Sequence, residues 1–266
     1  MSVESVSDSD YEVEYEAEDV EVGGGMAMRV MTLVPPPLEF MARLHSKSLE
    51  VSSRVVWTGS LLLCRHIMGG SLRSAGRAAG KCLELGAGTG LVGMALCKMG
   101  IGEAVVMTDG DDEALRLLRI NIEMNELDVE VPSSYYWGGE EEPLSKLSSW
   151  CTRKYPSLDW DGGSKFVSFD NIFAADVLYK SSLPALFFSS VATLLGKSGV
   201  LHLCHIPRAG VTHDMVVAEA EECGLEVLSD EEPYDLNSSL APMPPSVKWE
   251  DAVRARVYKI AKGKGT

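Results

Sequence analysis

The chain has 266 residues, 45% of them hydrophobic, which is enough for one sizeable α/β domain and too few for a second full domain. Its formal net charge is −15, but nine acidic residues and no Lys or Arg lie in positions 1–22, which leaves 30 acidic against 24 basic residues elsewhere. Binding along a nucleic-acid backbone depends on clustered Lys and Arg, so this balance argues against nucleic acid as a partner.

The cysteine pattern and the hydropathy favour a reduced protein without a membrane partner. Six cysteines are scattered without a Cys-x-x-Cys pair, which is typical of cytoplasmic or nuclear proteins. The N-terminus lacks a charged-then-apolar leader, and no apolar stretch approaches the roughly 18 residues of a membrane span. We expect a cytoplasmic or nuclear protein, and a monomer.

The first 25 residues differ in composition from the rest. They are rich in Asp, Glu and Ser, with few large apolar side chains to offset the entropy of an ordered chain, and Gly23-Gly24-Gly25 follows as a hinge. This composition predicts a disordered acidic tail over 1–25 and one domain over 26–266. We expect the tail to be solubilising, with docking to a basic partner as the alternative.

Strand and helix patterns alternate along that domain. A short strand at Met31–Val34 and a helix at 55–68 come first. Polar, turn-rich residues 138–165 read as an insertion or a long loop. The alternation predicts a Rossmann-like α/β fold whose mostly parallel seven-stranded sheet has helices on both faces and an antiparallel last strand. Its strands are expected at 81–85, 104–108, 129–136, 171–176, 199–205, 226–229 and 252–260, and its helices at 91–99, 111–125, 183–195 and 213–223.

A glycine-rich turn, Gly86-Ala87-Gly88-Thr89-Gly90, joins the strand at 81–85 to the helix at 91–99. Glycines here let a ligand approach the backbone closely and leave the first amides of the helix facing it. The third glycine comes one residue too early for the Gly-x-Gly-x-x-Gly of a dinucleotide fold, which disfavours a pyrophosphate ligand.

Two acidic residues are candidates for contacts near this turn. Asp109 ends the next strand, where it is placed to accept hydrogen bonds from two ribose hydroxyls of an adenosyl group or of NAD. Its alternative role is to cap the helix at 111–125. Glu84 would be a costly buried charge without a partner, which either a cofactor ammonium or backbone amides would supply.

The turn and Asp109 resemble motif I and the next motif of the seven-strand S-adenosylmethionine-dependent methyltransferases. With Val56–Leu63, Tyr136–Gly138 and Ala174–Tyr179, the chain resembles methyltransferase family 16, the lysine methyltransferase-like group. The resemblance implies S-adenosyl-L-methionine as cofactor. It also implies that the cofactor contacts are Trp57, Gly86, Ala87, Gly88, Asp109, Trp137 and Ala175. Either tryptophan has packing in the core as its alternative.

The same resemblance implies that Asp176 and Tyr179 form the family's Asp-x-x-Tyr element and align the amine of a protein lysine with the methyl group. In the alternative, Asp176 caps a helix that begins near Ser182 and Tyr179 packs beneath it. Three further functions stay open: a protein-arginine or small-molecule methyltransferase, a non-catalytic adaptor of methyltransferase fold, and an NAD-linked oxidoreductase.

Overall fold

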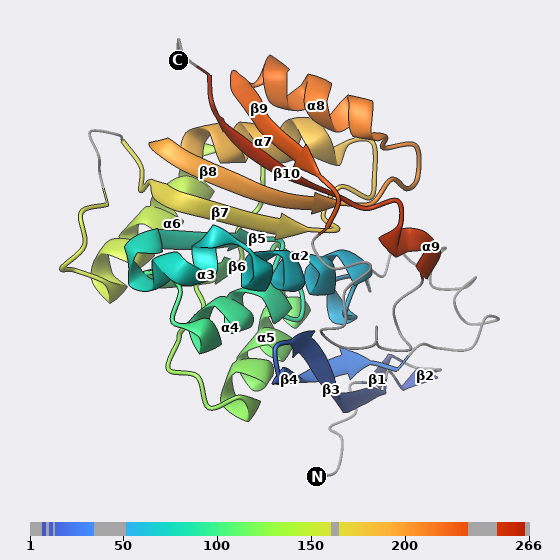
Figure 1. The fold of residues 1–266 in the computed structure, drawn as a ribbon. Coiled ribbons are helices and arrows are strands. Elements are labelled where there is room, and N and C mark those ends of the chain that lie inside the picture. The colour runs from blue at the N-terminus through green and yellow to red at the C-terminus, as the bar shows by residue number, and fades with distance from the viewer. Residues whose placement is uncertain are drawn as a thin grey trace.

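A six-stranded sheet forms the centre of the computed structural model, which describes residues 7–8, 11–12, 14–34, 52–160, 165–233 and 249–263 (Figure 1). The strand order is β6-β5-β7-β8-β10-β9. The first four are parallel neighbours, whereas β10 runs antiparallel to β8 and β9. This confirms the predicted Rossmann-like architecture with its antiparallel last strand. The strands are β5 (Lys81–Leu85), β6 (Ala104–Thr108), β7 (Phe169–Ala175), β8 (Leu195–His205), β9 (Leu225–Glu231) and β10 (Arg256–Lys262).

Helices cover both faces of the sheet, and the core consists of two clusters, one on each face. One cluster contains α2 (Thr58–Gly69), α4 (Leu91–Met99) and α5 (Asp112–Met124), and the other contains α6 (Glu141–Lys154), α7 (Leu183–Leu194) and α8 (His213–Glu222). Side chains of a strand alternate between faces, so Cys82 of β5 joins the first cluster and Leu83 the second. The shorter elements are η1 (Ser52–Arg54), α3 (Ser71–Ala75), η2 (Gly76–Ala79) and α9 (Trp249–Ala252).

None of the helices in the described ranges is long and apolar enough to cross a membrane. All six cysteines are free, as the sequence predicted. Four of them are buried, and burial raises the pKa of each of these thiols.

The acidic N-terminal segment forms strands, so the prediction of a disordered tail over 1–25 is wrong where the structure describes it. β3 (Tyr15–Gly23) and β4 (Met26–Leu33) pair antiparallel beside α5, after the short pair β1 (Ser7–Asp8) and β2 (Tyr11–Glu12) (Figure 1). Gly24 and Gly25 form the turn of this hairpin. Because a strand exposes alternate residues, Val20 and Val22 are buried in the core while the acidic side chains of β3 lie at exposed or half-buried positions.

The segment between β6 and β7 differs from the prediction in two places. The strand expected at 129–136 does not form: the Tyr135 N–H donates to the carbonyl of Asp109, the residue after β6 (2.9 Å), and Pro132 has no N–H to extend this pairing. The predicted long loop at 138–165 contains α6, whose buried residues Leu144, Leu147 and Cys151 follow helical spacing. The described part of the sheet thus has six strands instead of seven.

Candidate functional site

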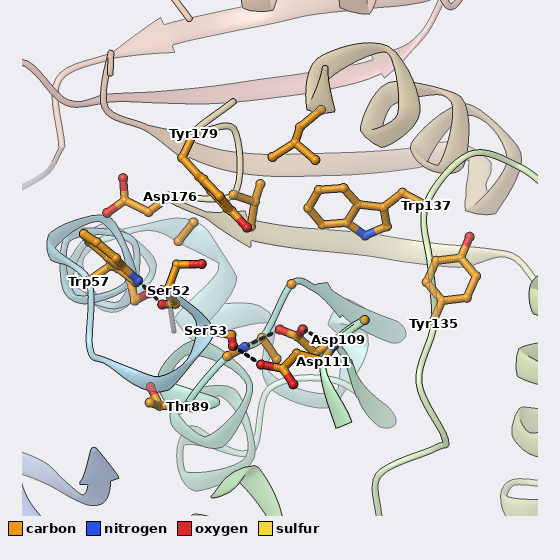
Figure 2. A pocket seen from close by; sticks show the side chains of 18 of the residues that line it. Ser52, Ser53, Trp57, Thr89, Asp109, Asp111, Tyr135, Trp137, Asp176 and Tyr179 are labelled. Carbon is orange, nitrogen blue, oxygen red and sulfur yellow. Dashed lines mark hydrogen bonds between the residues drawn. The ribbon is translucent and has the colours of Figure 1, made fainter. Parts of the chain in front are cut away.

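A cavity of about 520 Å³ lies at the carboxyl ends of β5, β6 and β7 (Figure 2). This is the edge at which ligands collect in parallel α/β sheets. Its walls come from η1 and the start of α2, from the glycine turn, from the end of β6, from residues 135–137, and from the residues that follow β7 up to the start of α7. The volume is within the range of about 300–1,000 Å³ typical of small-molecule sites.

The glycine turn, residues 86–90, is called the cofactor loop below. Gly86, Gly88 and Gly90 all have positive φ (70°, 52° and 84°), which side-chain-bearing residues rarely adopt. A Cβ added at Gly88 would lie 2.9 Å from the carbonyl oxygen of Ser53, so the loop and η1 are in close contact. The protein's own Ser53 carbonyl thus makes a close approach to the loop backbone, while the close approach of a ligand stays a prediction.

Asp109 lines the cavity directly beneath this loop. Its Oδ2 accepts the Gly88 N–H (2.8 Å) and its Oδ1 accepts the Asp111 N–H (2.9 Å), as Figure 2 shows in part. Each oxygen keeps a second lone pair for a ligand hydroxyl. Burial raises the pKa of the Asp109 carboxyl above its ordinary value. The side chain that caps α5 is Asp111, which accepts the Glu113 N–H (3.0 Å), so the helix-cap alternative for Asp109 does not describe the structure.

Glu84 is placed differently from the other predicted cofactor residues. Its carboxylate lies in the core under α4, does not line the cavity, and accepts the Gly93 N–H (2.8 Å). Burial raises the pKa of Glu84 to about 8, so the group is mostly protonated at neutral pH. The geometry therefore matches the alternative of a backbone-bonded side chain, and it does not match the predicted contact with a cofactor ammonium.

Aromatic side chains form much of the cavity wall. Trp137 stands beside Gly86 and packs edge-to-face on Phe187 at 5.2 Å between ring centroids. Trp57 begins α2, and its indole N–H donates to the Ser52 carbonyl (2.5 Å). Both tryptophans line the cavity, so neither is simply a core residue. Ala175, at the end of β7, also lines it.

Tyr179 and Asp176 are brought to the same side of the cavity but point differently. Figure 2 shows the Tyr179 ring projecting into the space between Trp57 and Trp137. The Asp176 side chain is only 1% exposed, and its two oxygens accept the Gly59 N–H (2.7 Å) and an Arg208 N–H (2.8 Å). Asp176 thus binds the first turn of α2, whereas the predicted alternative placed it at the helix near Ser182.

Sequence reasoning missed Ser52 and Ser53, which belong to the cavity wall, and Arg208, which lies behind it. Ser52 and Ser53 of η1 line the cavity, and the Ser53 hydroxyl donates to Asp111 Oδ2 (2.7 Å). Arg208, from the turn after β8, pairs with Asp176 and lies 5.0 Å over the Trp57 ring. No local pattern marks Ser53 or Arg208, since their side-chain partners Asp111 and Asp176 lie 58 and 32 positions away in the sequence.

The donor and acceptor set of the cavity fits S-adenosylmethionine. Asp109 offers acceptor sites for a ribose diol, the aromatic rings offer flat faces for a base, and Gly86 to Thr89 of the cofactor loop line the cavity. A Cβ at Gly88 would crowd the Ser53 carbonyl, and the positive φ of this residue also favours glycine.

Comparison with known proteins also indicates similarity to methyltransferases. The profile of the lysine methyltransferase family matches residues 41–150, which confirms the resemblance to methyltransferase family 16 over that segment. The chain is 33% identical over 131 residues to protein-lysine N-methyltransferase EEF2KMT of Bos taurus, and 33% identical over 138 residues to protein-lysine N-methyltransferase EFM6 of Saccharomyces cerevisiae. Each alignment covers 47% of this chain, and they cover 37% and 50% of the relatives, so the chain spans at most half of their length.

Solved structures share the fold at low identity. A Streptococcus mutans protein assigned as an S-adenosylmethionine-dependent methyltransferase matches 92% of this chain and 55% of its own, with a TM-score of 0.51 and 15% identity. A protein assigned as a methyltransferase and solved with S-adenosylhomocysteine matches 88% of this chain and 53% of its own, with a TM-score of 0.51 and 12% identity. These likenesses establish the fold class alone.

Proposed function

We propose that this chain, whose residues 41–150 match the lysine methyltransferase family, is an S-adenosylmethionine-dependent protein-lysine N-methyltransferase. The observation that carries the proposal is the position of Asp109. Its carboxylate lies in the cavity at the end of β6, bonded to the Gly88 amide of the cofactor loop and with lone pairs left for a ribose.

The chain's own residues would hold the cofactor in three ways. Asp109 would accept hydrogen bonds from the ribose, Trp137 would pack on an apolar part of the cofactor, and Gly86 to Gly88 would let it approach the backbone. When bound, S-adenosylmethionine supplies an electrophilic methyl group on sulfur. The protein's contribution is to orient the acceptor and to exclude water.

The acceptor side of the cavity suits an amine. Methyl transfer requires a neutral amine in line with the methyl group, and Trp57 and Tyr179 provide aromatic faces between which a lysine stem would fit (Figure 2). Tyr179 would align the amine. Asp176 would act mainly through α2, because both of its oxygens are already engaged by the chain.

The rim of the cavity favours a protein as the acceptor. Five large apolar side chains are exposed in the described part of the chain, and two of them, Tyr136 (61% exposed) and Leu186 (45%), line this cavity. Exposed apolar side chains around a site are typical of surfaces that bind another protein. A small polar substrate would not need them.

Two measurements test the proposal in order. Calorimetric titration should show binding of S-adenosylmethionine and no binding of NAD, which would exclude the oxidoreductase. Incubation of the protein with labelled S-adenosylmethionine and a cell extract should then label lysine residues, identified by mass spectrometry. Label on arginine or on small molecules would overturn the lysine assignment, and cofactor binding without turnover in any extract would favour the adaptor.

A further inference from the structure

The edge of β4 that faces α5 is bonded to two asparagine side chains. Asn121 Oδ1 accepts the Met31 N–H (2.6 Å), and Asn125 Oδ1 accepts the Arg29 N–H (2.9 Å). Asn121 also donates to the Met31 carbonyl (3.4 Å), and Asn125 also donates to the Arg29 carbonyl (2.7 Å). Both asparagines are buried and lie one helical turn apart. Buried main-chain groups need partners, so these amides take the place of a neighbouring strand.

Asn121 has a third contact, which reaches the cofactor loop. Its side-chain NH2 donates to the Thr89 carbonyl (2.9 Å), and Thr89 lines the cavity. The NH2 of Asn125 donates instead to the Asn121 carbonyl (2.7 Å) and lies 3.8 Å from the Met94 sulfur. One buried side chain therefore joins β4 to the loop, and its neighbour on the same helix face joins β4 to the helix.

The hairpin also bonds to η1, a second segment that lines the cavity. The Thr32 hydroxyl of β4 donates to the Arg54 carbonyl of η1 (3.2 Å). The Tyr15 hydroxyl of β3 accepts from Arg54 (3.4 Å) and donates to Glu113 of α5 (3.1 Å). η1 in turn touches the loop, since its Ser53 carbonyl lies against Gly88. The hairpin thus bonds directly to η1 and, through Asn121, to the cofactor loop, and both segments line the cavity.

We propose that the N-terminal hairpin (β3 and β4) is a positioning element of the cofactor pocket, and that Asn121 is the positioning residue through which it holds the cofactor loop. The inference rests on the proposed cofactor. A loop that samples several conformations binds its ligand more weakly, in proportion to the time it spends in the binding conformation. Without the Asn121 bond, the Thr89 carbonyl loses a buried hydrogen-bond partner. The loop can then adopt conformations other than the one that binds the cofactor.

The pair Asn121→Ala and Asn125→Ala tests this. Each removes the side chain that bonds one residue of β4, so both should lower the melting temperature. Titration calorimetry with S-adenosylmethionine, at a temperature where both variants are folded, should show about tenfold weaker binding for N121A, the equivalent of one buried hydrogen bond, and about wild-type binding for N125A. Equal losses of affinity in the two variants, or none in N121A, would overturn the proposal.

A second measurement separates this inference from the proposed function. Hydrogen–deuterium exchange of residues 86–94 should be faster in N121A than in N125A, whether or not any ligand binds. Wild-type protein that fails to bind S-adenosylmethionine would refute the cofactor, while the exchange rates would still decide the role of Asn121. Equal exchange rates would refute the coupling.

A third variant covers the case in which N121A does not fold. Thr32→Val keeps the shape of β4 and removes only the bond to the Arg54 carbonyl. It should weaken cofactor binding about threefold, the effect of a modest hydrogen bond. Its matched control is Thr193→Val, which removes a hydroxyl bonded to the Ser189 carbonyl (3.0 Å) on α7. Unchanged binding by T32V would contradict the role of the hairpin.

Discussion

Replacement of Arg208 by Met isolates the ion pair that holds the acceptor side of the cavity. The Asp176 side chain is 1% exposed and the Arg208 side chain 24%, with 2.8 Å between Oδ1 and Nη2. Removing one partner of a buried pair costs about 3–5 kcal/mol. This cost is reduced here because the Arg208 guanidinium is about a quarter exposed and because Asp176 keeps its hydrogen bond from the Gly59 N–H. We therefore expect a loss of about 2–3 kcal/mol in the free energy of unfolding at pH 7.

The loss should depend on pH in a defined direction. Burial already raises the pKa of Asp176, with Arg208 opposing that rise and Asp251 adding to it. Without Arg208 the folded-state pKa of Asp176 rises further, because the opposing positive charge is gone. The folded variant then binds more protons than the folded wild type, so the gap in stability should widen as pH rises from 5 to 8. The Cys204 thiol beside Asp176 stays protonated there, because burial raises its pKa well above the ordinary value.

Urea unfolding at several pH values measures the difference in stability between the wild type and the Arg208→Met variant. A double-mutant cycle with Asp176→Asn then shows whether that difference comes from the Asp176–Arg208 pair. The double variant should lose less than the sum of the two single variants, because neither charge is then left unpaired. Arg153→Met, which removes an equal charge from the exposed end of α6, should change little at any pH. A gap for R208M that is independent of pH, or additive single variants, would refute the assignment of a coupled buried pair.

Further predictions concern the cofactor loop and its neighbours. Asp109→Asn should weaken S-adenosylmethionine binding by about 10–100-fold, as loss of charge-assisted hydrogen bonds does, whereas exposed Asp112→Asn should not. Gly88→Ala should abolish detectable binding in calorimetry and destabilise the fold by about 1–2 kcal/mol, because its φ is +52°. Glu84→Gln should be nearly neutral at about pH 4, where the Glu84 carboxyl is largely protonated in the folded and the unfolded chain. As pH rises from there to about 8, the wild type should lose stability relative to this variant in urea unfolding, because only the folded state keeps the proton, and the difference should level off above pH 8.

Local periodicity predicted the elements that build the sheet, because their side chains repeat with the geometry of one strand or helix. The strands at 81–85 and 104–108 and the helix at 91–99 agree with the structure to the residue. The acidic hairpin was missed because its composition is typical of a disordered tail, although Val20 and Val22 alternate with polar residues and form its buried face. Helix α6 was missed because a few buried positions are spread among polar ones.

The candidate site divides in the same way. Asp109, Trp57, Trp137 and Tyr179 were found because motifs mark them, and the structure gathers them in one cavity. Their roles toward cofactor and acceptor stay predictions. Arg208 and Asn121 were not found, since each acts through partners that only the tertiary fold brings close. The orientation of Asp176, engaged with the chain itself, is equally a property of the fold.

The asparagines of α5 bind main-chain atoms of β4. These hydrogen bonds do not involve the outward side chains of the hairpin. Substitutions on its exposed surface are therefore free to accumulate as long as the alternate buried positions stay apolar and the strand stays extended. We therefore expect that surface to vary independently of the pocket that the same hairpin supports. Orthologous chains should accordingly keep Asn121 and the alternation of β3 and β4, while the number of acidic residues in this hairpin varies widely between them.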